Sequence, residues 1–372
     1  MVSLSICQTA RDRQAFEDVA ETLHGHDAAF IPPFPGSIAK FLSPKSVFNQ
    51  RHGEIIAFVA RRDGKLIGRI AAVINRSHNE FYKDKTGFFG FFECENDVHT
   101  ARALFEKAAE ILRGRGFTSM RGPYNPSIND ECGVLLHGFE KPPYIGLTWN
   151  PSYYDQLIKD AGVERVRKLL GYNLPLSTLE VPDRIKAIAD RQAKRSSLRL
   201  RPMDLKELPK ELEIIQEVYN STLERNWGFF PISMDDLLHA ANDLKAIADP
   251  RMILIAECKG ERAGVAMTLP NINELLILTK KTPKWLRPLH VLWLMKTRRI
   301  KTCRQIVYGV SPRFRDRGLH GWFMYEQLSK AKTYYDDAEL GWIEENNFEM
   351  LKASSIVQGY PYRSWGLYSR DL

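Results

Sequence analysis

The chain of 372 residues carries a net charge of +8 and a pI of about 9.1, with 44% hydrophobic and 26% charged residues. This length favours two domains, and the basic charge favours a nucleic acid, a lipid or a phosphate-rich cofactor as partner. No apolar run reaches the roughly 18 residues that span a bilayer, and the N-terminus lacks the apolar region of a signal peptide. The five cysteines share no metal-ligand or disulfide spacing, so we expect a cytoplasmic protein without a metal.

The first half predicts a hairpin, a strand and a helix in that order. Residues 54–74 read as two strands around the turn Asp63-Gly64, and residues 86–94 form an apolar run of strand length. Residues 98–117 then place apolar side chains at helical spacing before a glycine pair. This half is therefore one α/β unit.

The second half repeats this order of elements. Residues 251–270 predict a hairpin about Lys259-Gly260, followed by a strand over 303–310, a helix over 318–335 and a strand over 338–344. Between the halves, a charged helical pattern begins after Pro182 and a strand restarts at Leu198. We therefore predict an N-terminal domain over 1–165, a linker and crossover over 166–195 and a C-terminal domain over 196–372.

A basic, glycine-containing loop, SPRFRDRGLHG, joins the predicted strand 303–310 to the next helix. Backbone N–H groups and the positive end of the helix dipole suit a pyrophosphate at such a junction. Residues 315–320 fit the pattern [QR]xxGx[GA], except that His320 stands where a small residue is usual. The loop resembles the coenzyme A pyrophosphate site of the GNAT acyltransferase superfamily; a basic exposed turn is the alternative.

The resemblance implies one acyl-CoA site, in the second half. The residues expected to contact the cofactor are Gly309, Val310, Ser311, Arg313, Arg315, Asp316, Arg317, Gly318, Leu319, His320, Gly321 and Asn347. At the corresponding place the first half has Glu93, Glu95 and Asp97, which would repel a pyrophosphate. We expect Gly318→Glu to abolish donor binding and to leave the fold intact.

The whole chain, over roughly residues 20 to 365, is similar to a bacterial group of tandem GNAT-like N-acyltransferases that includes the bacterial ceramide synthases. The resemblance is carried by the segments "RGPYNPSINDECGVLLHGF", "NPSYY", "NWGFFP" and "ELGWIEEN". It implies an α/β fold with two GNAT-like domains in tandem, each a mixed central sheet flanked by helices. It also implies transfer of a fatty acyl group from acyl-CoA, or from an acyl-carrier protein, to the amine of a sphingoid-type lipid. The alternatives are a Fem-type transfer from aminoacyl-tRNA and a non-catalytic acyl-CoA-binding module.

Acyl transfer to an amine needs a base, a polarised carbonyl and an acid for the leaving thiolate. Strand alternation places Glu339 and Glu345 on one mostly apolar face, so we expect Glu345, then Glu339, as the base, with His320 third and solvated carboxylates as the alternative. The resemblance implies that backbone N–H groups of residues 309–311 polarise the carbonyl. Ala-Ser-Ser at 353–355 replaces the tyrosine of many GNAT enzymes. For the leaving-group acid this leaves open Ser354, Ser355, Tyr308, Tyr360 and solvent.

Four polar or aromatic residues are expected to contact the acceptor: Asn226, Trp227, Asn271 and Asn273. The resemblance places the first two where the first helices of the fold line the acceptor groove. The other two follow a predicted hairpin strand. For Asn226 and Trp227, which lie in the segment NWGFFP, packing in the core is the alternative.

Residues 280–304 hold nine Lys or Arg and no acid, interleaved with tryptophan and leucine. Such a mixture is typical of segments at a membrane interface, and the two prolines favour a helix from about Leu289. The expected membrane contacts are Trp285, Leu289, Trp293, Arg298 and Arg299, which would place the protein peripherally on an anionic cytoplasmic membrane face. A surface helix with solvated cations is the alternative, and nucleic-acid binding would need a module that we do not find.

Overall fold

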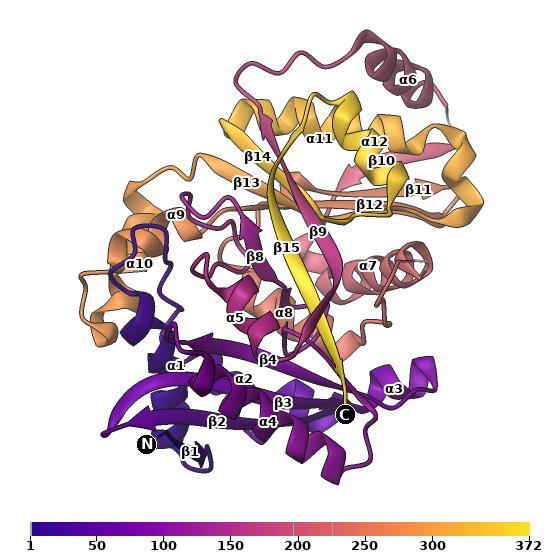
Figure 1. The fold of residues 1–372 in the computed structure, drawn as a ribbon. Helices are drawn as coiled ribbons and strands as arrows, with labels where there is room; N and C mark the ends of the chain where they lie inside the picture. Colours follow the sequence, from indigo (N-terminus) through magenta and orange to yellow (C-terminus); the bar gives the residue numbers. More distant parts are fainter. Residues whose placement is uncertain (1, 196, 225) are drawn as a thin grey trace. The chain divides into compact units, whose positions relative to one another are not determined.

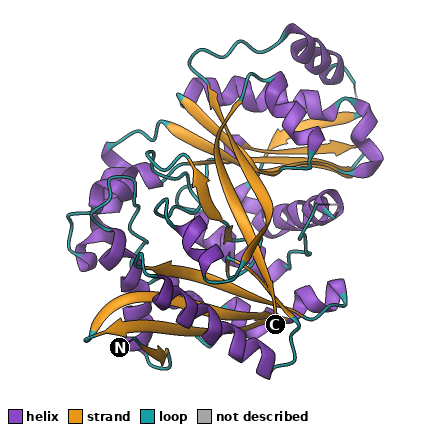
Figure 2. Cartoon of the chain, in the orientation of Figure 1, coloured by secondary structure: helices purple, strands orange, loops and turns teal. Residues whose placement is uncertain are grey.

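The computed structural model describes residues 2–195, 197–224 and 226–372, apart from the side chain of Asp316. Backbone contacts divide the chain into two compact units (Figure 1; Figure 2). Unit 1 is Met1–Leu169, Asn273–Arg298 and Arg363–Leu372, and unit 2 is Leu170–Ile272 and Arg299–Tyr362. The units are thus discontinuous in sequence. The continuous domain boundaries expected from the sequence stay a prediction.

Unit 1 is built on a mixed sheet in the order β1-β2-β3-β4-β5-β15. Its neighbouring strands pair antiparallel, apart from the parallel pair of β4 and β5, and β8 pairs antiparallel with β15. The strands are β1 (Ser3–Ile6), β2 (Gly53–Arg62), β3 (Lys65–Asn75), β4 (Thr86–Cys94), β5 (Ser119–Gly122), β8 (Val134–His137) and the end of β15 (Tyr360–Asp371), with a separate pair β6 (Tyr124–Asn125) and β7 (Glu131–Cys132). The helices are α1 (Ala10–His24), α2 (Ser37–Phe41), α3 (Arg76–Tyr82), α4 (Val98–Gly114), α5 (Tyr154–Asp160), α9 (Asn273–Leu276) and α10 (Arg287–Thr297).

Helix α4 forms because its apolar side chains recur every three or four residues and its first turn is capped. The Asp97 side chain accepts hydrogen bonds from the backbone N–H groups of His99 and Thr100. Its buried residues Leu104 and Phe105 pack in one core with residues of β2, β3 and β4. The predicted hairpin, strand and helix of the first half are confirmed.

Unit 2 is built on a sheet in the order β14-β13-β12-β11-β10, antiparallel apart from the parallel pair of β13 and β14. Its strands are β10 (Leu198–Pro202), β11 (Ile253–Cys258), β12 (Glu261–Pro270), β13 (Thr302–Val310) and β14 (Asp337–Glu344), together with the end of β9 (Glu164–Pro175). Its helices are α6 (Asp183–Ala193), α7 (Leu208–Leu223), α8 (Met234–Leu244), α11 (Leu319–Tyr334) and α12 (Phe348–Ile356). The hairpin, strands and helix predicted for the second half are confirmed.

Side-chain alternation in β11 gives this sheet two apolar faces. Leu254 and Ala256 pack with α11 in one core, whereas Ile253 and Ile255 pack with α7 in another. Figure 1 shows α11 and α12 on one side of the sheet and α7 on the other. The two layers hold β13 firmly between them, and β13 leads into the predicted loop.

Candidate active site

Strands β13 and β14 part after a short parallel ladder. Cα partners run from Thr302 with Asp337 to Gln305 with Leu340, and the ladder has no further rung among the described residues. Both strands continue beyond it, β13 to Val310 and β14 to Glu344. On the β14 side, the Gly341 carbonyl oxygen, just past the last rung, accepts from Arg304 Nε at 2.9 Å.

A bulge in β13 lies where the strands part. Opposite β12, Gln305 pairs with Thr268 and Val307 pairs with Met267, so Ile306 is the extra residue. A bulge bends its strand and shifts the alternation of the side chains that follow. As a result Tyr308 joins Cys303 and Gln305 on one face of β13, where all three line the same cavity.

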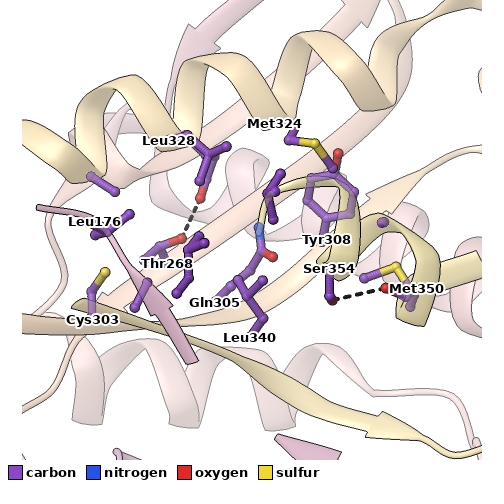
Figure 3. A pocket seen from close by; sticks show the side chains of 16 residues that line it. Leu176, Thr268, Cys303, Gln305, Tyr308, Met324, Leu328, Leu340, Met350 and Ser354 are labelled. Atoms are coloured by element: carbon purple, nitrogen blue, oxygen red, sulfur yellow. Dashed lines mark hydrogen bonds between the residues drawn. The ribbon is translucent and has the colours of Figure 1, made fainter. Parts of the chain in front are cut away.

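That cavity, of about 50 Å³, lies within unit 2 between the sheet and helices α11 and α12 (Figure 3). Its walls are mostly aliphatic or thioether side chains, including Leu176, Met324, Leu328, Leu340 and Met350. A cavity of this composition favours an apolar ligand.

The polar groups of the cavity wall are largely committed to the protein itself. The Thr268 hydroxyl donates to the side chain of Gln327, whose amide donates to the carbonyl oxygens of Met252 (3.0 Å) and Ala266 (2.9 Å). The Ser354 hydroxyl donates to the Met350 carbonyl oxygen at 3.0 Å (Figure 3). The wall therefore offers few polar groups to a ligand.

Tyr308 connects the cavity to the start of α11. Its hydroxyl donates to the carbonyl oxygen of His320 at 2.5 Å, and the two rings lie 5.7 Å apart between centroids. Burial raises the pKa of Tyr308, so the phenol keeps its proton. Burial, followed by the charge of Arg315, lowers the pKa of His320 against an opposing effect of Glu349. The imidazole is therefore neutral at pH 7 and can accept a proton.

Gly318 opens helix α11 in the left-handed conformation that the predicted loop requires, with φ of 74°. Helix α6 covers this glycine. A Cβ atom at position 318 would lie 2.7 Å from Gln192 Nε2, and one at Gly321 would lie 2.8 Å from Ile188 Cγ2. Gln192 is itself buried, and its Oε1 has no hydrogen-bond partner within the described residues. The expectation that Gly318→Glu leaves the fold intact stays a prediction, but any side chain there strains the backbone and meets α6, so the variant should be destabilised.

Replacing Gly318 by Ala is expected to destabilise the protein more than replacing Gly260 by Ala. Both glycines have positive φ, 74° and 82°, but a Cβ atom at 260 meets nothing within 4 Å. The left-handed backbone costs about 1–2 kcal/mol at either site, and contact with Gln192 adds to it at 318 only. Urea unfolding of the two variants measures the difference. Equal losses would show that α6 does not press on residue 318.

The loop arginines point to different partners. Arg313 is exposed and pairs with Glu261 (3.4 Å), and Arg315 donates to the Thr222 carbonyl oxygen (3.3 Å). Arg317 donates to Cys258 Sγ (3.6 Å) and lies over the Phe314 ring. Leu319 is buried in the core, and the Asp316 side chain lies outside the described part of the chain. The three guanidinium groups bind different partners and do not converge on one point. Their contact with the cofactor stays a prediction.

The backbone at the end of β13 shows which of the N–H groups of residues 309–311 can reach an acyl carbonyl oxygen. The Ser311 N–H donates to the carbonyl oxygen of Ala263 in the neighbouring strand β12 at 2.9 Å, so it is already used. Successive N–H groups of a strand point to opposite edges, which directs the Val310 N–H to the edge where β14 has parted. Of the three, Val310 has the geometry for an oxyanion contact.

Thr222, at the end of α7, lies against Gly309 and was not singled out in the sequence. A Cβ atom at position 309 would lie 3.1 Å from Thr222 Oγ1, and this buried hydroxyl oxygen has no hydrogen-bond partner among the described residues. Glycine at 309 therefore makes room for the threonine. Like Gln192, Thr222 comes from an element distant in sequence, so no motif of the loop could have indicated it.

The predicted carboxylate bases lie in different surroundings. Glu339 is fully buried, its Cα is the register partner of buried Arg304, and it lies on the face of β14 opposite to Ala338 and Leu340 of the cavity. Glu345 follows the strand, which ends at Glu344, so the alternation expected for it does not apply. Both residues stay predictions, but neither lines the cavity.

Among the four candidate acids, Tyr308 and Ser354 line the cavity. The Ser355 hydroxyl donates to the Leu351 carbonyl oxygen at 3.1 Å on an exposed part of α12, and Tyr360 is exposed. The structure thus places two of the four in the wall of the cavity.

The remaining predicted residues have structural partners. Asn347 caps α12 by accepting from the Met350 N–H (3.2 Å), and Asn271 donates to Thr302 Oγ1 (3.0 Å). Asn273 belongs to unit 1, where it donates to the Pro143 carbonyl oxygen (3.0 Å). Asn226 and Trp227 lie half-buried in the turn after α7. Acceptor contact at these positions stays a prediction.

In unit 1 the place that corresponds to the loop is occupied by carboxylates in tight contacts. Partly buried Glu93 accepts a hydrogen bond from the Tyr154 hydroxyl (2.7 Å) and pairs with His24 (3.2 Å) and Arg69 (3.4 Å). Glu95 and Asp97 both pair with Arg62, at 2.6 and 2.7 Å. These contacts indicate that the carboxylates at the end of β4 stabilise unit 1.

Within the described residues, no group of three or more His, Cys, Asp or Glu side chains could hold a metal ion. No helix in the described ranges is long and apolar enough to cross a membrane.

No family model matches the chain. Over 98% of this chain and 96% of its own length, the bacterial ceramide synthase of Caulobacter vibrioides is 30% identical to it. Protein YghO of Escherichia coli is 28% identical, covering 97% of this chain and 93% of its own length. Among solved structures, a tandem GNAT protein from the clavulanic acid biosynthesis pathway superposes with a TM-score of 0.59 at 12% identity, covering 100% of this chain and 98% of its own.

The two α/β units, the parted strands and the glycine that opens α11 thus belong to a tandem GNAT fold, as the sequence predicted. The identity to the Caulobacter protein over nearly the whole chain goes further. The chain belongs to the bacterial ceramide synthase family, and it is an N-acyltransferase.

Proposed function

We propose that this N-acyltransferase moves a fatty acyl group from acyl-CoA to the amine of a sphingoid-type lipid. The observation that carries the proposal is the apolar cavity beside the parted ends of β13 and β14, with Tyr308 in its wall. An apolar wall suits part of a fatty acyl chain. The name of the Caulobacter relative, a ceramide synthase, supports a sphingoid amine as acceptor.

The residues present fit an acyl-CoA donor. The N–H groups that open α11 after Gly318, with Arg315 nearby, suit its pyrophosphate. Between the parted strands, the Val310 N–H suits the acyl carbonyl oxygen. When bound, acyl-CoA supplies the thioester carbon that the amine attacks. An acyl-carrier protein would present the same thioester without the nucleotide end.

His320 and Tyr308 are the proton-handling groups of the proposed reaction. His320, neutral at pH 7 because its pKa is lowered, accepts a proton from the acceptor ammonium. Tyr308 turns its O–H from the His320 carbonyl to the leaving sulfur as the C–S bond breaks, and the phenolate takes the second proton, which the substrate nitrogen loses as the amide forms. The two rings lie next to each other near the start of α11. Proton transfer from the ammonium and proton transfer to the sulfur therefore take place close together.

The test incubates the purified protein with palmitoyl-CoA and 3-ketosphinganine and detects products by mass spectrometry. We expect an N-acylated sphingoid base, and an acid limb of the pH–rate profile that lies below the usual histidine value, since activity is lost as His320 becomes protonated. Parallel reactions with acyl-carrier protein and aminoacyl-tRNA compare the donors. Absence of any N-acylated sphingoid product, with palmitoyl-CoA bound, would leave a binding module and refute the proposal.

A further inference from the structure

Among the large apolar side chains of the described residues that are more than half exposed, all but Phe348 of α12 lie on one segment of unit 1. Trp285 is 77% exposed, Leu289 64% and Trp293 56%, and Leu292 and Leu278 are more than half exposed. They lie on α10 and on the short turns that precede it. Single exposed apolar residues need no explanation, but a contiguous group of this kind marks a contact surface.

Helix α10 is apolar on two opposite faces. Leu289, Leu292 and Trp293 recur at helical spacing and form the outer apolar face, and Lys296 lies one turn beyond them. Val291 and Leu294, on the other face, are buried. Burial of the inner face explains how the helix packs on its own unit, and it leaves the outer face without a role in folding.

Acidic residues of the N-terminal part hold this segment in place. Lys284 pairs with Asp18 (2.6 Å) and Glu21 (3.2 Å) of α1, and buried Arg287 binds the same Glu21 carboxylate with both terminal nitrogens. Lys280 donates to the Asp27 carbonyl oxygen. Lys280, Lys284 and Arg287 therefore bind groups of unit 1 itself. These contacts hold the segment in the orientation that exposes the outer face of α10.

The remaining cations of the segment surround the apolar face. Lys281, Lys296 and Arg298 are exposed and enter no ion pair within the described part of the chain. The stretch from residue 275 to residue 298 contains no acid. Arg299 was expected at this surface but donates to the Tyr334 carbonyl oxygen (2.7 Å) within unit 2. We therefore do not count it among the cations around the apolar face.

We propose that this docking surface, made of Leu278, Lys281, Trp285, Leu289, Leu292, Trp293, Lys296 and Arg298, binds the interface of an anionic lipid bilayer. Indole rings and leucines enter the headgroup level, and the cations lie against lipid phosphates. Charge complementarity selects this occupant, because a second copy of the same surface would bring like charges together. The inference goes beyond the acyl transfer and does not depend on its substrates.

The experiment is vesicle co-sedimentation of the full chain. Vesicles of phosphatidylcholine alone are compared with vesicles that contain about 30% phosphatidylglycerol, which supplies the anionic surface potential. We expect the wild type to bind the anionic vesicles at least tenfold more tightly, since three cations face the surface, and to release them as salt is raised. The variant Lys281→Gln/Lys296→Gln/Arg298→Gln should lose this preference.

The variant Trp285→Ser/Trp293→Ser tests the apolar part and should bind anionic vesicles at least tenfold more weakly. Its matched control, Phe34→Ser/Leu205→Ser, removes two exposed apolar side chains elsewhere and should bind like the wild type. Thermal melts establish that each variant is folded. Equal binding of the two double variants overturns the proposal.

Two other outcomes would also overturn it by naming a different occupant. One is a concentration-dependent dimer in sedimentation velocity that the Trp285→Ser/Trp293→Ser variant abolishes. The other is binding of a single-stranded RNA oligonucleotide that the same variant abolishes and that anionic vesicles do not displace. Neither readout requires catalysis, so failure of this inference and failure of the proposed reaction are distinguishable.

Discussion

Tyr308→Phe lowers kcat by about 10²-fold with little change in KM for the acyl donor, because a proton donor to the leaving sulfur acts mainly in the transition state. The phenol lies in the cavity wall at 2.5 Å from the His320 carbonyl oxygen, and burial keeps it protonated. Phenylalanine preserves the ring and the apolar wall and removes the hydroxyl alone. Steady-state kinetics with palmitoyl-CoA and the sphingoid amine measure the effect.

Two controls separate chemistry from packing in this experiment. Tyr360→Phe changes an exposed tyrosine outside the cavity and should leave kcat as it is. Ser354→Ala removes the second hydroxyl of the wall, which donates within its own helix, and should have a small effect. If Ser354→Ala lowers kcat by two orders of magnitude and Tyr308→Phe does not, the roles assigned to the two hydroxyls are wrong.

Glu93→Leu destabilises the protein by about 3–5 kcal/mol, because it leaves a buried guanidinium without its carboxylate. Arg69 is 4% exposed and pairs with Glu93 at 3.4 Å, and Glu93 also accepts from Tyr154 at 2.7 Å. Chemical denaturation followed by circular dichroism measures the loss. Glu95→Leu is the matched control, since Glu95 pairs with a half-exposed Arg62 that keeps Asp97, and should cost about 1 kcal/mol or less.

The same carboxylate makes a pH-dependent contribution to stability. Burial alone would raise the pKa of Glu93, but hydrogen bonds from His24 and the charge of Arg69 outweigh it and hold the pKa below its usual value. A lowered carboxylate pKa stabilises the folded state above the unfolded value of about 4.5 and loses this contribution as the pH falls through the folded value. Glu93→Leu should therefore flatten the acid limb of the stability profile. An unchanged limb would contradict the assignment.

Local signals predicted the elements well. The turns Asp63-Gly64 and Lys259-Gly260 have positive φ at both residues and lie between the strands expected around them. Helix α10 begins at Arg287 rather than near Leu289, because a proline is tolerated in the first turn. Signals of this kind lie within a few residues of the feature that they determine.

Features that depend on distant residues could not be predicted in the same way. Lys284 pairs with Asp18, 266 positions earlier, and this contact ties the segment 273–298 to unit 1. Gln192 and Thr222 reach the loop and the end of β13 from α6 and α7. Nothing in the neighbouring sequence indicates which helix will cover a glycine.

In the candidate site, one extra residue in β13 was enough to make a prediction from the sequence fail. Strict alternation from Cys303 and Gln305 would bring Val307 and Gly309 to the cavity face of β13. The bulge at Ile306 brings Tyr308 there instead. A period of two residues, counted on the sequence, therefore assigns the wrong face to the side chain with the most useful chemistry.

The division of the chain between the units also governs what can be cut from it. The polypeptide passes from one unit to the other at 169/170, 272/273, 298/299 and 362/363, and both termini belong to unit 1. A fragment that starts at residue 196 would lack Leu174 and Leu176 of the cavity wall. It would also carry α10 without Asp18 and Glu21. The half that holds the candidate site is therefore not a separable module, and single-domain truncations should yield aggregation-prone chains rather than a minimal transferase.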